Sequence, residues 1–256
     1  MHICIHLATI AARAHSLPVE DMDLKMDISQ TIQELYTDSA NFDVHLKSIS
    51  KQISNGEIKL VDLIEQLGSK LTSKEIQNRV TALDILASIF SQLSKDYLTE
   101  KELMFIVEFL QDRIKDQHLV IPKVIFAIDA ILRYKHLPKQ ARSNLLRSVM
   151  QEINIQSHTH KVRRVFLQSV QFMLHHHLNE LKTEMATDFV ISYLQCIDGE
   201  KDPRNLIVIF QSIPIILQSF TMGPFSEDFF EVLGCYFPID FTPVSLLSLL
   251  ITVLRK

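Results

Sequence analysis

The chain has 256 residues, of which 47% are hydrophobic and 22% charged, proportions typical of a folded protein, and this excludes wholesale disorder. Its 5 Gly and 8 Pro are too few for the many tight turns of a β-sandwich or barrel. The net charge of −4 and the absence of Trp weigh against a dedicated nucleic-acid binder, which carries a basic stripe and stacking aromatic side chains.

The three cysteines are Cys4, Cys196 and Cys235. Their odd number and wide spacing do not make a disulfide framework, which favours a reducing nuclear or cytosolic compartment. Cys196 and Cys235 lie on apolar helix faces, so we expect both in the core. The apolar run over residues 244–254 is much shorter than the ~20 residues that span a bilayer, so we expect no membrane association.

In chain order, the predicted organisation begins with an irregular leader over residues 1–45, with one helix expected around residues 28–36. A repeat array follows over residues 46–243, and a divergent apolar tail occupies residues 244–256. Apolar positions at i, i+3, i+4 and i+7 predict the helices of the array. Their ranges are 57–67, 76–93, 103–115, 121–134, 139–153, 162–178, 181–197, 206–220 and 225–236.

Local start and stop signals support several of these boundaries. Gly68 is expected to end the first array helix. Thr72 and Thr99 are each followed three positions later by Glu, which predicts two capping boxes. Pro122 lies in the first turn of its helix, where its missing amide costs nothing. Asp202 before Pro203 predicts an N-cap.

A basic residue recurs in the first turn of every second helix. Arg79, Lys123, Arg163 and Arg204 mark steps of 44, 40 and 41 residues. A period of ~40–47 residues with two helices per unit is typical of HEAT and armadillo arrays. Because one amphipathic pair cannot bury its apolar stripe alone, neighbouring pairs must stack. The sequence therefore predicts an all-α protein, a HEAT/armadillo-like α-solenoid of antiparallel helix pairs.

No pattern of chemically active residues emerges from the sequence. The histidines 175–177 are adjacent, and consecutive helical residues point ~100° apart, so they cannot converge on one metal. The acidic turn over residues 198–202 lacks the alternating ligands and terminal Glu of an EF-hand. Nucleotide-binding, hydrolase and metalloprotease motifs are missing. We therefore expect no enzyme, no metal site and no cofactor.

Four stretches resemble the N-terminal region of the MMS nineteen nucleotide excision repair protein family. They run in colinear order within about residues 45–243, and the C-Y-F-P-I-D-F-T-P string is long and unusual. The stretches are residues 61–68, 113–122, 198–206 and 230–243.

The resemblance implies a HEAT-repeat scaffold of cytosolic iron–sulfur protein assembly. Its implied partners are the subunits of the cytosolic iron–sulfur targeting complex and apo iron–sulfur proteins such as DNA helicases and polymerases. The implied location is the nucleus and cytoplasm. It further implies that the chain corresponds to the first quarter of a much longer protein.

A candidate partner-binding surface is the inter-repeat turn that holds Gly199, Glu200, Lys201 and Arg204, because polar turns along one edge of a solenoid often form its binding face. Two alternatives stay open. One is a DNA-associated repair or transcription factor that acts directly on nucleic acid. The other is a folded but incomplete fragment of the scaffold.

Overall fold

The computed structural model describes residues 32–36 and 40–236, and these residues form helices, turns and loops without a β-strand. The predicted all-α class is therefore confirmed. The predicted tail over residues 244–256 and most of the leader lie outside the described residues. Residues 32–36 are helical, and the α-helices that follow are α3 (Phe42–Ser54), α4 (Leu60–Leu71), α5 (Ile76–Gln92), α6 (Glu100–Arg113), α7 (Ile121–Leu132), α8 (Lys139–Glu152), α9 (His160–His176), α10 (Leu178–Glu184), α11 (Thr187–Ile197), α12 (Pro203–Ser219) and α13 (Ser226–Gly234).

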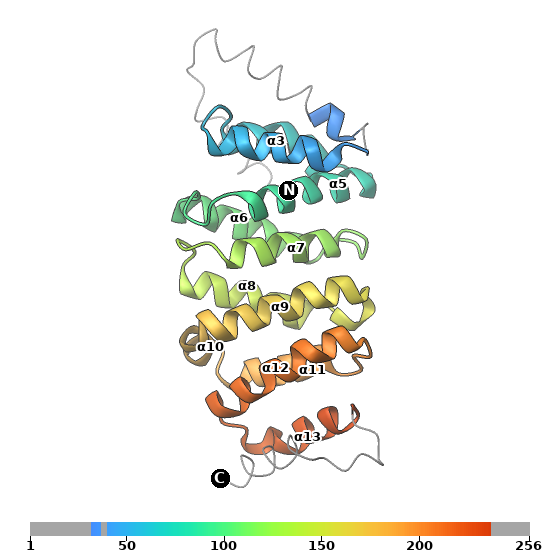
Figure 1. The fold of residues 1–256 in the computed structure, drawn as a ribbon, viewed down its shortest axis with the longest axis vertical. Coiled ribbons are helices and arrows are strands. Elements are labelled where there is room, and N and C mark those ends of the chain that lie inside the picture. The colour runs from blue at the N-terminus through green and yellow to red at the C-terminus, as the bar shows by residue number, and fades with distance from the viewer. Residues whose placement is uncertain (1–31, 37–39, 237–256) are drawn as a thin grey trace. The chain divides into compact units, whose positions relative to one another are not determined.

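The chain divides into two compact units, Met1–Ala141 and Arg142–Lys256. In the first unit, α5 packs between α3 and α7, while α4 covers α5 and α6 covers α7 (Figure 1). In the second unit, α9 packs against α12, and α11 contacts α13. The helices α5, α7, α9 and α12 are those marked by the recurring basic residues, so the predicted stacking of helix pairs is confirmed within each unit.

Two of the predicted caps are present and one is not. Thr99 and Glu102 form the capping box of α6, and the Asp202 carboxylate accepts from the N–H of Arg204 at the start of α12. The box predicted at Thr72 is wrong. Its hydroxyl instead donates to the carbonyl of Gly68 at 2.9 Å. Gly68 is not a helix end either, because α4 continues through it to Leu71.

The single helix predicted over residues 181–197 is broken into α10 and α11. Ala186 lies between them with φ +49°, a left-handed conformation that costs a residue with a Cβ about 1–2 kcal/mol. Its N–H donates to the carbonyl of Leu181 at 2.9 Å, which closes the end of α10. The break lets Leu181, Met185 and Phe189 all be buried. No Gly or Pro lies at this point of the sequence from which the break could be predicted.

Helix α3 was not among the predicted helices. Its apolar residues Leu46, Ile49 and Ile53 are buried, and the helix packs against α5. Polar and charged residues fill most other positions of α3, so its apolar stripe is narrow. The helix spans the predicted boundary between leader and array at residue 45.

Two tyrosines connect successive repeats by hydrogen bonds from their hydroxyls to main-chain carbonyls. Tyr97 donates its hydroxyl to the carbonyl of Ile53 at 3.2 Å, and Tyr134 donates to that of Phe90 at 3.0 Å, each 44 residues back in the chain. Tyr134 is fully buried, and this burial raises the pKa of its phenol. Each hydroxyl therefore satisfies a carbonyl near the end of a preceding helix, where intrahelical partners run out.

A second contact between repeats is an ionic clasp made by Arg79, the fourth residue of α5. Its Nε and Nη2 atoms donate to the Asp116 carboxylate at 3.2 and 2.9 Å. Its Nη1 atom donates to the carbonyl of Ser73 at 2.6 Å. Asp116 lies in the loop between α6 and α7, so one guanidinium joins the entry of its own helix to the next repeat.

The same clasp recurs in the second unit with Arg163, the fourth residue of α9. Its Nε and Nη2 atoms donate to the Glu200 carboxylate at 2.8 and 2.7 Å, and Nη1 donates to the carbonyl of His158 at 2.7 Å. The Arg79–Asp116 and Arg163–Glu200 pairs each span 37 residues. This two-pronged geometry suits the planar guanidinium and a carboxylate.

The other two basic marks form different ion pairs. Lys123 of α7 reaches back to Asp84 of α5, with 2.7 Å between Nζ and Oδ2. Arg204 pairs with Asp202, its own N-cap, also at 2.7 Å. The recurring basic residue is thus paired in every repeat, and in two of the four it forms the clasp.

We expect Arg163→Ala to lower the free energy of unfolding by about 2–3 kcal/mol, because the buried Glu200 carboxylate would lose its partner. The neighbouring Arg164→Ala is a matched control that should change it by about 0.5 kcal/mol or less, since Arg164 makes no hydrogen bond or ion pair with the described residues. Urea unfolding followed by circular dichroism measures both. Equal losses in the two variants would contradict the clasp.

Candidate functional site

The predicted partner-binding residues lie together in the turn between α11 and α12. Gly199 has φ +79°, a conformation that favours glycine. The N–H of Glu200 donates to the carbonyl of Ile197 at 3.0 Å, closing the turn. Gly199, Lys201 and Arg204 are exposed to solvent, whereas Glu200 is buried.

Glu200 faces inward and organises the turn. Besides the two bonds from Arg163, its carboxylate accepts from the backbone N–H groups of Lys201 and Asp202, both at 2.9 Å. It also accepts from the side-chain amide of Asn205 at 3.0 Å. The side chain of Glu200 has no exposed surface. A buried carboxylate needs such a full set of donors to offset its lost hydration.

The electrostatics of the turn follow from these contacts. Burial alone would raise the pKa of Glu200, but the hydrogen bonds from Arg163, Asp202 and Asn205 outweigh it and hold the pKa below its ordinary value. The Glu200 hydrogen bond in turn raises the pKa of Arg163. Glu200 and Arg163 therefore stay ionised and paired at neutral pH.

Asn205 connects the starts of α12 and α9. Its side-chain amide donates to the carbonyl of His160, the first residue of α9, at 3.1 Å. Asn205 is buried, and nothing in the sequence analysis marked it. The usable signal was the equal spacing of Arg79 to Asp116 and of Arg163 to Glu200, which would have identified both carboxylates as internal partners.

The exposed part of the turn consists of Gly199, Lys201 and Arg204. Arg204 keeps 59% of its side-chain surface while paired with Asp202. The Arg204 hydrogen bond lowers the pKa of Asp202. Partner binding by this turn stays a prediction. Because Glu200 is buried, its part in such binding is to fix the shape of the turn and not to contact the partner directly.

The adjacent histidines have separate environments. His175 and His176 are exposed on the last turn of α9. The Nδ1 atom of His177 lies 2.9 Å from Glu180 Oε1 and 3.3 Å from Arg142 Nη1. Burial, followed by the Arg142 charge, lowers the pKa of His177. Within residues 32–36 and 40–236, no three His, Cys, Asp or Glu side chains gather closely enough to hold a metal ion.

The two described cysteines differ. Cys196 is buried, as expected, and its burial raises the pKa of the thiol to about 12. The prediction for Cys235 is wrong, because this residue is exposed. Helix α13 ends at Gly234 and buries Phe229 and Leu233. Cys235 follows that end and falls outside the buried stripe.

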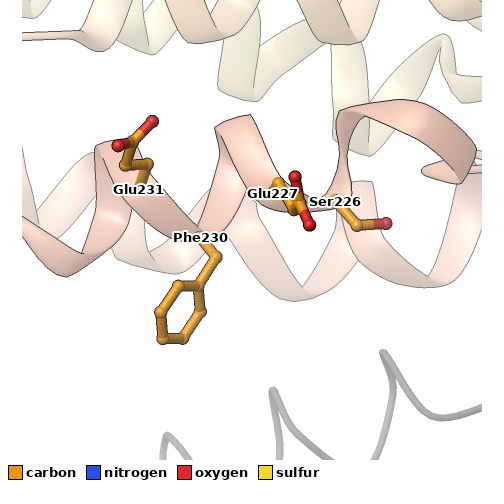
Figure 2. Close-up of a pocket in the computed structure, with 4 residues that line it drawn as sticks. All are labelled: Ser226, Glu227, Phe230 and Glu231. Atoms are coloured by element: carbon orange, nitrogen blue, oxygen red, sulfur yellow. The ribbon is translucent and has the colours of Figure 1, made fainter.

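A shallow, open depression runs along α13. It is lined by Ser226, Glu227, Phe230 and Glu231. Figure 2 shows these side chains extending from the helix in different directions, with Phe230 and Glu231 on opposite sides of it. The four side chains do not converge on one point.

Among the described helices, none is long and apolar enough to cross a membrane.

The lowered pKa of Glu200 predicts a pH dependence of stability. A group whose pKa is depressed on folding stabilises the protein above its unfolded-state pKa, about 4.3 for Glu, and loses that contribution as pH falls through the folded-state pKa. The melting temperature of Glu200→Gln should therefore lie well below that of wild type at pH 7, and the difference between the two melting temperatures should shrink at acid pH. Thermal melts from pH 7 to pH 3 measure it.

Glu108→Gln is the control for that series, because Glu108 is exposed on α6 and should melt within a degree or two of wild type throughout. A difference between Glu200→Gln and wild type that stays constant with pH would contradict the ionised clasp.

Comparison with known proteins relates this chain to one family. Residues 64–252 match the family model described as "Dos2-interacting transcription regulator of RNA-Pol-II". The MMS19 nucleotide excision repair protein of Drosophila melanogaster is 35% identical over 195 residues, covering 76% of this chain and 20% of the relative. The human homolog is 34% identical over 196 residues, covering 76% of this chain and 19% of the relative.

A more distant relative gives the same result. The Dictyostelium discoideum homolog is 32% identical over 193 residues, covering 75% of this chain and 17% of the relative. The chain thus spans about a fifth of the length of the relatives it matches. The family match over residues 64–252 contains helices α5, α7, α9 and α12 and the α11–α12 turn. The chain belongs to the MMS19 nucleotide excision repair protein family and corresponds to its N-terminal region.

Proposed function

We propose that the chain is a non-catalytic scaffold segment of the cytosolic iron–sulfur targeting machinery, and that it contacts apo iron–sulfur client proteins of DNA repair, replication and transcription. The observation that carries this proposal is the family match over residues 64–252. The repeats, which leave polar turns and helix faces open to solvent, support a role in holding other proteins.

In this function the iron–sulfur cluster is cargo rather than a resident cofactor. A scaffold of this kind recognises the proteins that give and receive the cluster, so its own side chains need not ligate iron. Because assembly is cytosolic while helicases and polymerases act on DNA, we propose that the chain works in both cytoplasm and nucleus.

Direct action on DNA is a second candidate. It is favoured by the relatives' names, which refer to nucleotide excision repair, and by the family description, which refers to transcription. A mobility shift of single-stranded and duplex oligonucleotides over a range of salt concentrations tests it, because phosphate contacts weaken steeply as salt rises. A strong, salt-sensitive shift would favour DNA binding over the scaffold function.

The scaffold function is tested by binding. The whole purified chain is immobilised, and the targeting subunits and an apo iron–sulfur helicase are applied separately in biolayer interferometry. We expect the apo helicase to bind without the other subunits. Binding to none of these proteins, with the helical circular dichroism intact, would contradict the proposal for this chain.

Within this assay, Lys201→Glu should weaken helicase binding by about five- to tenfold, since it places an opposite charge in the exposed α11–α12 turn. Lys101→Glu is the matched control, because Lys101 is also exposed, on α6, and it should bind like wild type. Unchanged binding by Lys201→Glu would exclude the turn as the contact, whatever the behaviour of the rest of the chain.

A further inference from the structure

The helices that carry the recurring basic residues, α5 and α7 in the first unit and α9 and α12 in the second, differ in their acidic residues. Helices α5 and α7 each contain an aspartate, and both are neutralised: Asp84 pairs with Lys123, and Asp129 pairs with Arg133, each at 2.7 Å. Helices α9 and α12 contain no Asp or Glu at all. The surface that α9 and α12 expose therefore has no carboxylate of its own to neutralise its cations.

This surface, here called the α9–α12 face, is made of one stripe from each helix. Gln171 of α9 donates its side-chain amide to Gln211 of α12 at 3.1 Å and so joins the stripes. The exposed and half-exposed residues of the face are Lys161, Arg164, Gln168, Gln171 and His175 on α9, and Arg204, Ile207, Gln211, Pro214 and Gln218 on α12.

The positive charge of the face comes from Lys161 and Arg164. Neither side chain makes a hydrogen bond or ion pair within the part of the chain that the structure describes. Arg204 is already matched by Asp202. The other acid exposed in the turn is Asp198, which precedes α12 and is not part of either helix. The N-terminal ends of α9 and α12, held together through Asn205, add the positive ends of two helix dipoles.

An apolar side chain lies beside this charge. Ile207 is 57% exposed and sits one turn after Arg204 on the same stripe of α12. Farther along, the face consists of glutamine amides, which can both donate and accept hydrogen bonds. The face thus combines cations at one end, an exposed aliphatic side chain near them and neutral hydrogen-bonding groups in the middle.

We propose that the α9–α12 face binds an acidic, extended segment of a partner protein. Carboxylates of the segment pair with Lys161 and Arg164, an aliphatic side chain packs on Ile207, and its backbone bonds to the glutamine amides. The 17 residues of α9 make a helix about 25 Å long, which an extended segment of about eight residues covers.

The pattern of charge favours a peptide over a nucleic acid. A polynucleotide carries phosphates along its whole length and needs cations all along the groove that binds it. The α9–α12 face has its lysine and arginine at one end and neutral amides beyond them. This proposal depends on the face alone, so it holds or fails separately from the iron–sulfur scaffold function.

The test uses a fluorescein-labelled synthetic peptide of twelve residues, with aspartates and glutamates in its N-terminal half and two leucines next to them. Its fluorescence anisotropy is titrated with the whole chain and with the Lys161→Glu/Arg164→Glu double variant. We expect micromolar binding by wild type and at least about a tenfold loss in the variant, since two charge contacts become repulsive.

The Lys47→Glu/Lys101→Glu double variant is the matched control. Lys47 and Lys101 are exposed on α3 and α6, and the net charge changes by the same amount. We expect this control to bind within about twofold of wild type, and circular dichroism checks that all three proteins are folded. Equal loss in both double variants, or no peptide binding by wild type, would overturn the proposal. Displacement of the peptide by a lower concentration of single-stranded DNA would overturn it in favour of a nucleic-acid site.

Discussion

The contact on which the repeats most depend is the clasp between an arginine at the start of a second helix and a carboxylate in the loop of the following repeat. Arg79 with Asp116 and Arg163 with Glu200 make it with the same atoms and the same spacing. Burying either charge alone would be costly, so each pair fixes the position of its loop as well as stabilising it. Hydrophobic stacking provides most of the burial energy but is tolerant of small shifts. The paired charges are directional, and they set the register between neighbouring helices within each unit.

This contact also explains how far sequence reasoning reached. The basic residue was visible at intervals of 40 to 44 residues, and it predicted the helix pairs because it lies in the first turn of one helix of each pair, although only two of the four residues form the clasp. The acidic partners lie in loops, where no helical periodicity marks them, and only the equal 37-residue spacing of the two pairs would have identified them. Glu200 was therefore assigned to an outer surface when its side chain points inward. The break at Ala186 escaped prediction for a related reason: a tertiary demand to bury Met185 and Phe189 overrides the local preference for continuous helix.

For function, the inward position of Glu200 divides the α11–α12 turn into two parts. Glu200, Asn205 and Arg163 hold the turn in shape, while Lys201 and Arg204 remain at the surface. The turn leads directly into α12, and through Asn205 it lies next to the start of α9. The proposed client contact and the α9–α12 face are thus neighbouring parts of the second unit, with separate residues and separate tests. Family membership gives the scaffold proposal its support, whereas the face is argued from charge and exposure alone.

The most direct test of the clasp is a double-mutant cycle on Arg79 and Asp116, where both side chains are nearly buried. The free energies of unfolding of wild type, Arg79→Met, Asp116→Asn and the double variant give the coupling energy free of each residue's other contacts. We expect a coupling of about 1.5–3 kcal/mol. A coupling below about 0.5 kcal/mol would mean that the two residues are neighbours without holding the repeats together, and would contradict the structural role of the clasp.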